Sequence, residues 1–575
     1  MKETSYAFSG DLSIVLSGEA GQGIQTIESM LTSFAKKSSY GVFATKEYMS
    51  RVRGGCNSTE ILLSRNRVGS RVDRIDVLVA LTPGAIPHLR RRITDRTLVL
   101  GEKETVVFDG LVDMPFSSIA RDVGGSIFSN TVAVGAICAL VKLDSDLCEA
   151  STRAIFASKG DEIRDKNVLA LDKGYELGLS LASKVSIDIG RPEADPEDIM
   201  LTGAEAVSFG ALAGGCNYVC AYPMSPGTTV LTTMAEHSKK FDLLVEQVED
   251  EIGVANMAIG AWYAGARALV TTSGGGFALM SEAMSLSGMI ETPFVAHIAQ
   301  RPGPATGLPT RTEQGDLDLA IHSGHGDFLK IVLAPGDLSE GYELGKAAFD
   351  LADRFQSPVL LLTDQYYVDS YYTTAAFNVD PKPLAPRVVT GGPGYRRYAL
   401  GSPDGISPRA LPGISEGLVC VDSDEHDEGG HITEDPEVRK AMVEKRLAKI
   451  DAAKRAAIPP RLYGGEGGGY SHLLLGWGSV KGPVLAALAV LGRKDIAFLH
   501  FPWVYPLPAG VSAYLERARS IFAIEGNATG QLAALVEAET GHRIDGRILK
   551  YDGFQFSTEE LAERIKAALP KGGAV

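Results

Sequence analysis

Short, predominantly apolar segments recur along this chain and alternate with helical patterns. They lie at Leu12–Leu16, Val77–Leu81, Thr97–Leu100, Tyr218–Tyr222, Ala268–Thr272, Phe294–Ile298 and Val359–Thr363. Strands that are apolar throughout are buried on both faces, as in parallel sheets covered by helices. The sequence therefore predicts an α/β protein with parallel sheets.

The chain has 575 residues, more than one hydrophobic core of about 300 residues accommodates. Two polar stretches divide it, so we expect three α/β domains at 1–187, 200–375 and 466–575. A short linker, 188–199, contains Arg-Pro and Asp-Pro, and 376–465 is expected to be an extended surface linker with a charged helix near Glu437–Arg455. The acidic run Asp422–His431 is interpreted as solvated linker or subunit contact rather than as a metal site.

Composition excludes several classes of function. The net charge of −15 disfavours nucleic acids and anionic membranes as partners, because both require clustered Lys and Arg. No apolar run reaches the roughly 18 residues of a spanning helix, and no signal peptide is visible, so a cytoplasmic protein is expected. The six cysteines form no C-x-x-C pair, which disfavours an iron–sulfur or zinc site in this chain.

A glycine-rich turn follows the first apolar segment, with Gly18, Gly21 and Gly23 in the spacing G-x-x-G-x-G. Such a turn before a helix can present backbone N–H groups to an anion, but it can equally be a tight structural turn. Downstream, Arg51 and Arg53 precede a glycine pair, and guanidinium groups suit phosphates.

The region from residue 200 carries an ordered series of motifs near predicted strand ends, where α/β proteins place ligands. The motifs are Ala221-Tyr222-Pro223-Met-Ser225-Pro226, Glu249-Asp-Glu251, Thr271-Thr-Ser273-Gly274-Gly-Gly276, Arg301-Pro-Gly-Pro and Gly307-Leu-Pro-Thr310-Arg311-Thr-Glu-Gln314. Acidic residues at a helix start are usually caps, and arginines are usually exposed. Glu251, however, precedes the small and apolar stretch Ile252–Gly260, which favours a function over a cap. Arg301 and Arg311 lie beyond predicted strand ends and beside Gly and Pro, which favours a function for them as well.

This series resembles the pyrimidine-binding domain of the 2-oxoacid:ferredoxin oxidoreductases, whose motifs run Y-P-I-T-P, a glutamate, T-S-G-P-G and P-T-[KR]-T-E-Q. The turn at Gly18–Gly23 with Arg51-Val-Arg53-Gly-Gly resembles the γ domain of that family. Gly476-Trp-Gly-Ser479, Glu525-Gly-Asn527 and Tyr551-Asp-Gly553 resemble its transketolase C-terminal-like domain. The resemblance covers nearly the whole chain, with Ser225 standing where the family usually has threonine.

The resemblance implies a role for each motif. Glu251 corresponds to the glutamate that hydrogen-bonds the aminopyrimidine of thiamine diphosphate and promotes its activation. Further cofactor contacts are implied at Tyr222, Pro223, Ser273 and Gly274, and substrate contacts at Ser225, Arg301, Thr310 and Arg311. The γ-type domain implies coenzyme A contacts at Gly18, Gly21, Gly23, Arg51 and Arg53. No residue of this chain is expected to bind a metal.

The resemblance also implies partners. The chain has no G-D-G…N-type segment and no cysteine set for a cluster, so the cofactor diphosphate with Mg²⁺ and a [4Fe–4S] cluster are expected on a β subunit, in an (αβ)₂ assembly. The expected substrates are 2-oxoglutarate and coenzyme A, with ferredoxin as electron acceptor. Pyruvate, branched-chain 2-oxoacids and a non-catalytic scaffold that binds coenzyme A or a nucleotide remain alternatives. The direction of the reaction stays open.

Overall fold

The computed structural model describes residues 5–19, 22–49, 55–380, 384–414, 416–465 and 469–569. Gly21, Arg51 and Arg53 lie outside the described residues. The chain forms two compact units. One comprises the residues up to Leu201 together with Ser370–Ala376 and Ser557–Glu559, and the other comprises Thr202–Asp369, Phe377–Phe556 and the residues from Glu560 onward. In the described residues no helix is both long and apolar enough to cross a membrane.

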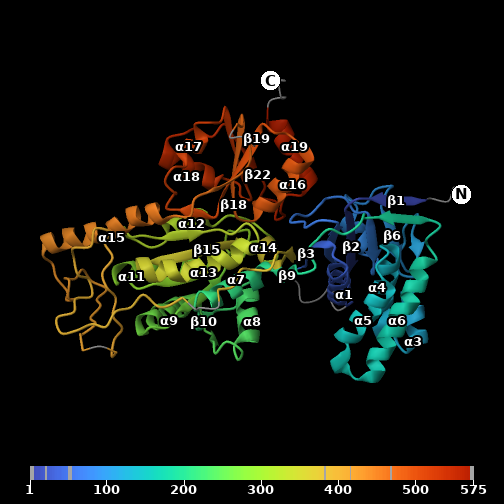
Figure 1. The fold of residues 1–575 in the computed structure, drawn as a ribbon, viewed down its shortest axis with the longest axis horizontal. Coiled ribbons are helices and arrows are strands. Elements are labelled where there is room, and N and C mark those ends of the chain that lie inside the picture. Colours follow the sequence, from blue (N-terminus) through green and yellow to red (C-terminus); the bar gives the residue numbers. More distant parts are fainter. Residues whose placement is uncertain are drawn as a thin grey trace. The chain divides into compact units, whose positions relative to one another are not determined.

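The N-terminal unit contains an eight-stranded sheet in the order β7-β6-β5-β2-β4-β3-β16-β9 (Figure 1). The strands are β2 (Leu12–Gly18), β3 (Gly41–Glu47), β4 (Asn57–Ser64), β5 (Val77–Ala80), β6 (Leu98–Gly101), β7 (Val112–Asp113), β9 (Ile199–Thr202) and β16 (Tyr371–Thr374). The prediction of a parallel sheet is correct from β7 to β2 and wrong beyond it. There β4 pairs antiparallel with both β2 and β3. The reason is that β4 follows β3 without the crossover that a parallel pair requires, and returns between β3 and β2.

The helices of this unit pack closely because glycines face neighbouring backbones. They are α1 (Ile24–Lys37), α2 (Ala85–Leu89), α3 (Phe116–Val123), α4 (Ser129–Leu140), α5 (Ser145–Ile155) and α6 (Asp161–Leu179), and a small sheet pairs β1 (Tyr6–Ser9) with β8 (Val185–Asp188). A Cβ on Gly135 would lie 2.1 Å from the carbonyl oxygen of Leu171, and one on Gly174 would lie 2.0 Å from that of Val132. The contact between α4 and α6 therefore requires glycine on both helices.

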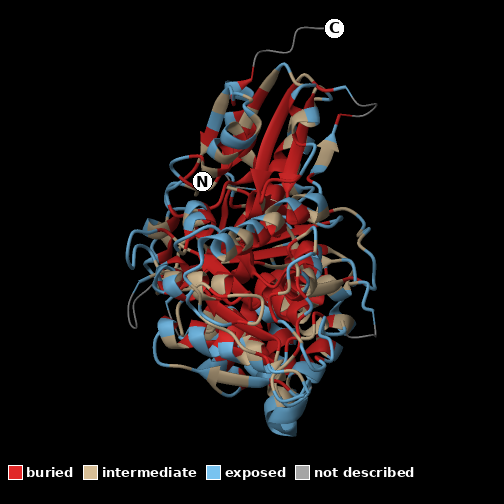
Figure 2. Cartoon of the chain, turned by 90° about the vertical axis from the view of Figure 1, so that its left-hand side faces the viewer, coloured by how far each residue is buried: buried red, intermediate tan, exposed pale blue. Residues whose placement is uncertain are grey.

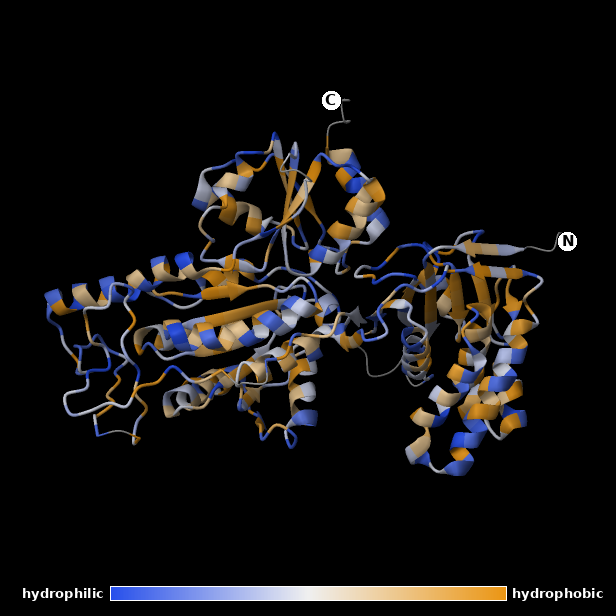
Figure 3. Cartoon of the chain, in the orientation of Figure 1, coloured by the Kyte–Doolittle hydropathy of each residue, from blue (hydrophilic) through white to orange (hydrophobic). Residues whose placement is uncertain are grey.

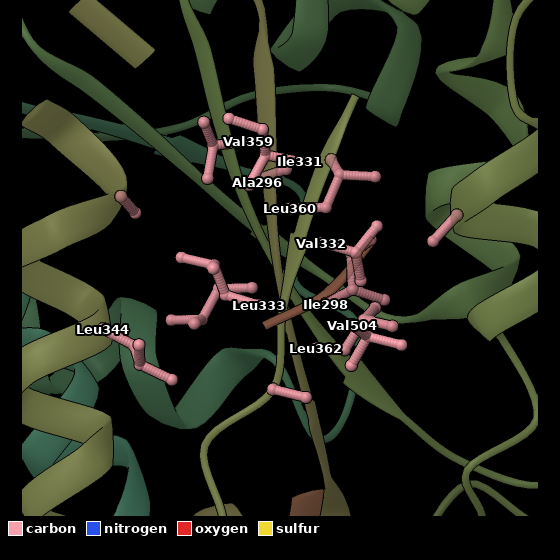
Figure 4. Close-up of a cluster of buried hydrophobic side chains, with 14 of the residues drawn as sticks. Ala296, Ile298, Ile331, Val332, Leu333, Leu344, Val359, Leu360, Leu362 and Val504 are labelled. Atoms are coloured by element: carbon pink, nitrogen blue, oxygen red, sulfur yellow. The ribbon is translucent and has the colours of Figure 1, made fainter. Parts of the chain in front are cut away.

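The C-terminal unit is built around a seven-stranded sheet in the order β11-β10-β12-β13-β15-β14-β20. The strands are β10 (Tyr218–Ala221), β11 (Leu244–Gln247), β12 (Ala268–Thr272), β13 (Phe294–Gln300), β14 (Ile331–Leu333), β15 (Pro358–Asp364) and β20 (Trp503–Tyr505). All pairs are parallel except β14 with β20. The aliphatic side chains of β13, β14 and β15 form its core together with Leu344 and Val504 (Figure 4). The four apolar segments predicted here are all strands.

Helices cover this sheet, with buried residues along the strands and exposed residues on the outer helix faces (Figure 2). They are α7 (Gly203–Ala213), α8 (Thr228–His237), α9 (Glu251–Ala264), α10 (Gly274–Leu279), α11 (Ser281–Met289), α12 (Leu317–His322), α13 (Leu338–Phe355) and α14 (Gln365–Asp369). Side chains define several starts: Thr202 and Glu205 form a capping box on α7, and the side chain of Asp337 accepts from the N–H of Glu340 on α13.

A five-stranded sheet in the order β17-β19-β18-β21-β22 belongs to the same unit. Its elements are β17 (Arg461–Gly464), β18 (His472–Trp477), α16 (Lys481–Leu491), β19 (Ile496–Phe501), α17 (Ser512–Leu515), β21 (Ser520–Glu525), α18 (Gln531–Thr540), β22 (Gly546–Leu549) and α19 (Thr558–Ala568). The strands are strongly apolar (Figure 3). Lys481, the first residue of α16, connects this sheet to α13 through ion pairs with Asp337 and, at 2.7 Å, with Glu340.

The region 376–465, which was expected to be a linker, is anchored by buried ion pairs. Helix α15 (Pro436–Ala456) is present, as predicted. Its Lys445 and Lys449 pair at 2.6 Å with Glu291, which is 1% exposed. Within the acidic run, His426 is fully buried and its ring lies 3.9 Å from that of Tyr398. The interpretation of that run as solvated is therefore wrong for its centre.

Candidate functional site

Four loops meet at the carboxyl edge of the seven-stranded sheet. They follow the adjacent parallel strands β11, β10, β12 and β13. The chain runs from β10 outward to β11 and then returns to β12 on the other side of β10. In α/β proteins the crevice that binds ligands lies at such a reversal of strand order. The segments after β10 and β12 border this expected ligand crevice, and they carry the motifs at 222–226 and 273–276.

Glu251 is the first residue of α9, directly after Asp250, whose side chain accepts a hydrogen bond from the N–H of Gly253 at 2.8 Å. Asp250 is therefore the cap, and Glu251 is left for another role. Glu251 is only 3% exposed, and its Oε1 atom is buried without a hydrogen-bond partner in the described part of the chain. A buried carboxylate oxygen without a partner is costly, which indicates that a ligand group completes it.

Gly276 allows Glu251 to reach the crevice. A Cβ at this position would lie 2.7 Å from Oε1 of Glu251 and 2.3 Å from the hydroxyl oxygen of Thr272. Even an alanine therefore could not occupy this place without a shift of its neighbours. The third glycine of the Ser273–Gly276 segment is therefore needed because any side chain there would occupy the space of the Glu251 carboxyl.

Ser225 and Arg301 meet across the crevice. Arg301 follows β13, and its Nη1 donates to the carbonyl oxygen of Ser225 at 2.6 Å. Burial lowers the pKa of Arg301, and the nearby charge of Asp316 opposes this effect. In the loop after β10, Tyr222 is 37% exposed, Pro223 is partly buried and the Ser225 side chain is exposed. The Ser225–Arg301 contact thus joins the loop after β10, which carries a ring and a hydroxyl, to a guanidinium after β13.

At the start of α10, the side-chain oxygen of Ser273 is buried and lacks a hydrogen-bond partner within the described residues. Gly274 lies against Asp316: a Cβ there would lie 2.3 Å from both carboxyl oxygens. Burial raises the pKa of Asp316 to about 7; the charge of Glu313 adds to this, and that of Arg301 opposes it. Sequence reasoning missed Asp316. The only signal was its place just after the Thr-Glu-Gln motif.

Thr310 and Arg311 lie in the loop between β13 and α12, and both are partly buried. The guanidinium of Arg311 stacks over the ring of Phe554 at 4.9 Å, and its Nη1 approaches the carbonyl oxygen of Thr310 at 3.4 Å. The N–H of Thr312 donates to the carbonyl oxygen of Gly553 at 3.1 Å. The structure therefore holds Arg311 in place through the C-terminal sheet, as a pre-positioned cation requires.

Gln314 joins this loop to the five-stranded sheet. It is buried, and its side chain donates to the carbonyl oxygen of Trp477 and accepts from the N–H of Gly526, both at 2.8 Å. Glu525 is fully buried as well, and accepts from Trp477, Asn527 and the N–H groups of Leu532 and Ala533. Its carboxylate is fully bonded within the protein. The Glu-Gly-Asn motif is therefore structural here.

The glycine-rich turn belongs to the N-terminal unit. Gly18 ends β2, and Gly23 precedes α1 at φ 74°, where a Cβ would lie 1.8 Å from the side-chain nitrogen of Asn130. Beside it is a cavity of about 410 Å³ at the carboxyl ends of β5 and β6. Its polar lining includes the side chains of Gln22, Glu102, Thr105, Ser117, Ser126, Ser129 and Asn130. Gln22 and Asn130, the residue that Gly23 adjoins, thus line a cavity, while Gly21, Arg51 and Arg53 lie outside the described residues.

Two family descriptions match this chain. "Pyruvate flavodoxin/ferredoxin oxidoreductase, thiamine diP-bdg" matches residues 209–445, and "Pyruvate ferredoxin/flavodoxin oxidoreductase" matches residues 13–177. The 2-oxoacid:ferredoxin oxidoreductase subunit alpha of a Sulfolobus species is 30% identical over 98% of this chain and 97% of its own length. This chain belongs to the 2-oxoacid:ferredoxin oxidoreductase family. The resemblance seen in the sequence and the α/β fold class are both confirmed.

Other relatives of this oxidoreductase subunit carry more specific names. The 2-oxoglutarate oxidoreductase subunit KorA of Mycobacterium tuberculosis is 29% identical over 97% of this chain and 91% of its own length. The structure of 2-oxoglutarate:ferredoxin oxidoreductase from Magnetococcus marinus, with 2-oxoglutarate, coenzyme A and succinyl-CoA bound, matches with a TM-score of 0.89. It is 29% identical and covers 97% of this chain and 99% of that one. The chain is a subunit of a thiamine-diphosphate-dependent oxidoreductase.

Proposed function

We propose that this chain is the α subunit of a 2-oxoglutarate:ferredoxin oxidoreductase. The reaction converts 2-oxoglutarate and coenzyme A to succinyl-CoA and CO₂, with the electrons passing to ferredoxin, and it can run in reverse to fix CO₂. The observation that carries the proposal is the buried Oε1 of Glu251 at the carboxyl edge of the sheet, which has no hydrogen-bond partner among the residues that the structure describes. We also propose the domains expected from the sequence, 1–187, 200–375 and 466–575, with strand β17 (Arg461–Gly464) joining the sheet of the third and strand β16 (Tyr371–Thr374) that of the first.

The residues around Glu251 fit the aminopyrimidine half of thiamine diphosphate. Glu251 presents a carboxyl oxygen that lacks a protein partner, and Ser273 presents a hydroxyl in the same condition within the described residues. Tyr222, Pro223 and Gly274 border the same crevice. When bound, this cofactor supplies a nucleophilic carbon that makes decarboxylation of a 2-oxoacid feasible. Glu251 would hold the proton that it shares with the pyrimidine ring nitrogen and keep water from that atom.

The substrate is proposed to bind between Ser225, Arg301, Thr310 and Arg311. Both carboxylates of 2-oxoglutarate need charged or hydroxyl partners once they leave water. Arg301 and Ser225 would hold the carboxylate beside the keto group, and Arg311, held against Phe554, would pair with the distal one. The names of the Mycobacterium and Magnetococcus relatives support a dicarboxylate substrate.

Coenzyme A is proposed to contact the glycine-rich turn of the N-terminal unit. Gly18, Gly21 and Gly23 would present backbone groups to it, and Arg51 and Arg53 would pair with its phosphates. The polar cavity next to Gln22 and Asn130 supports an anionic or hydroxyl-rich ligand at this turn. The coenzyme A bound to the Magnetococcus relative also supports this role.

A β subunit is proposed to complete the enzyme in an (αβ)₂ assembly in the cytoplasm. It would hold the diphosphate end of the cofactor with Mg²⁺ and the [4Fe–4S] cluster that passes electrons to ferredoxin. The Sulfolobus relative is named an alpha subunit, which supports the need for a partner subunit. The isolated chain is accordingly expected to contain no iron and to show no turnover.

The experiment is to co-purify the chain with its β subunit and to follow coenzyme A-dependent reduction of ferredoxin or methyl viologen. 2-Oxoglutarate, pyruvate, 2-oxobutyrate and a branched-chain 2-oxoacid are compared at equal concentration. The proposal expects the highest kcat/KM for 2-oxoglutarate and succinyl-CoA as product. A preference for pyruvate or a branched-chain acid would change the substrate that we assign. The absence of turnover with all four acids would contradict the proposed enzymatic activity.

A further inference from the structure

Asp316 is a second carboxyl group at the crevice, and its role is unassigned. It is the last residue before α12, and its N–H donates to the side-chain oxygen of Gln300 at 3.0 Å. Its carboxyl does not cap the helix. The Oδ2 atom is buried and has no hydrogen-bond partner among the described residues. A carboxyl with such an oxygen is unusual unless it is protonated or meets a ligand.

Gly274 brings this carboxyl to the turn after β12. Because a Cβ on Gly274 would lie 2.3 Å from both oxygens, only glycine lets Asp316 pack there. Gly276, two residues along the same turn, accommodates Glu251 in the same way. One glycine turn therefore admits two carboxyl groups, of which Glu251 faces the proposed pyrimidine position. Asp316 interacts electrostatically with Arg301.

The charged groups around Asp316 come from several elements. Arg301 follows β13 and Glu313 precedes α12; both act on Asp316 electrostatically. Glu251 at the start of α9 contacts the far end of the glycine turn, and Asp318 on α12 itself is exposed. Burial and Glu313 together outweigh Arg301, and the pKa of Asp316 is raised to about 7. Its carboxyl therefore changes charge near neutral pH.

Arg301 and Asp316 do not neutralise each other by direct contact. Within the described part of the chain, Arg301 forms no ion pair and donates only to the carbonyl oxygen of Ser225. A guanidinium has five N–H donors, so most of its donors are left for a ligand. An ionised Asp316 beside that ligand position would oppose a carboxylate, whereas a protonated Asp316 would donate to it.

We propose that Asp316 is a substrate-recognition residue: its protonated carboxyl shares the 2-oxoacid carboxylate with Arg301, and its ionised form weakens that binding. The inference rests on the proposed function, which places the 2-oxoacid at Ser225 and Arg301. The inference adds the carboxyl group of Asp316 to the residues that are proposed to bind the substrate carboxylate. Substrate affinity then depends on the protonation of Asp316.

The test is the pH dependence of KM for 2-oxoglutarate in the complex of this chain with its β subunit, from about pH 6 to about pH 9. The substrate carboxylates stay ionised throughout this range. In the wild-type complex, KM is expected to be about tenfold higher at pH 8 than at pH 6, because binding requires one proton on the enzyme. Asp316→Asn keeps a donor and removes the titration, so its KM profile is expected to be flat.

Two further variants keep the test independent of any folding defect in Asp316→Asn. Asp318→Asn changes the exposed carboxylate two residues along and should keep the wild-type profile. Glu313→Gln leaves Asp316 in place but removes a charge that raises its pKa, so the rise in KM should begin at lower pH. A purely structural Asp316 would give no such shift.

The outcomes separate the two proposals. Wild-type turnover with a KM profile that neither Asp316→Asn nor Glu313→Gln alters would overturn the role of Asp316 and leave the enzyme intact. Absence of turnover with any 2-oxoacid would overturn the proposed function and this role with it. A flat profile in Asp316→Asn together with the shift in Glu313→Gln supports the role.

Discussion

The carboxylate of Glu251 lies against Gly276 so closely that a methyl group on the glycine would stand 2.7 Å from Oε1. The two residues come from different loops, after β11 and after β12, and meet only because β11, β10 and β12 are neighbours in the sheet. The position of the proposed catalytic carboxylate therefore depends on the absence of a side chain at Gly276.

Gly276→Ala is expected to lower turnover about 10- to 100-fold, since displacement of a catalytic group by about 1 Å has an effect of this size. Gly260→Ala on α9 is the matched control, because a Cβ there would meet nothing within 4 Å. Steady-state assays of both variants in the complex with the β subunit provide the comparison. Equal turnover of the two variants would show that a displacement of the Glu251 carboxyl does not affect catalysis.

Arg311→Met is expected to raise KM for 2-oxoglutarate about 10- to 100-fold, the effect of losing a charge-assisted hydrogen bond, and to change KM for 2-oxobutyrate little. Arg301→Met should raise KM for both substrates, because it is proposed to hold the carboxylate that they share. An equal rise in KM for both substrates in Arg311→Met would instead assign Arg311 to the carboxylate that the two substrates share. No loss for either would leave it with a structural role against Phe554.

Glu291→Gln is expected to lower the free energy of unfolding by about 3–5 kcal/mol, because Lys445 and Lys449 would be left buried without their partner. Glu282→Gln, an exposed acidic position on α11, is the control and should change it by less than about 0.5 kcal/mol. Denaturant unfolding of the chain measures both. Similar values for the two would mean that the lysines find other acceptors.

The same cluster predicts a loss of stability in acid. Burial alone would raise the pKa of Glu291, but Lys449, Lys445 and Arg397 outweigh it and hold this pKa well below its ordinary value. A carboxyl of this kind stabilises the fold above its unfolded pKa of about 4.5 and loses the contribution as the pH falls below it. Unfolding from about pH 7 to about pH 3 should show a smaller acid destabilisation in Glu291→Gln than in the wild type.

The sequence predicted the elements that carry the site. Continuous apolar segments such as Phe294–Ile298 are strands because both faces of the central sheet are covered, and turns such as Ser273–Gly276 follow strands at one edge. Glu251 could be identified because its neighbours in α9 are small and uncharged. These features depend on local composition and on the order of the motifs.

Other features depend on tertiary contacts that no local pattern reveals. Asp316 matters because Gly274, more than 40 positions earlier in the sequence, leaves room for its carboxyl. Glu525 belongs to a motif that the sequence shares with the family, yet its carboxylate is bonded by four donors of the protein itself, from Trp477 in β18, from Asn527 and from Leu532 and Ala533 in α18. Strand β20 extends the central sheet by antiparallel pairing with β14, although the two strands are separated by about 170 residues.

The most direct test of the account is the rate of proton exchange at C2 of thiamine diphosphate in the complex with the β subunit, with Glu251→Gln and Glu249→Gln compared with the wild type. Glu249 is exposed and serves as the control. The account predicts a loss of about 10²- to 10⁴-fold in Glu251→Gln, with cofactor still bound, and a wild-type rate in Glu249→Gln. A wild-type exchange rate in Glu251→Gln would contradict it, because the cofactor would then be activated by another residue.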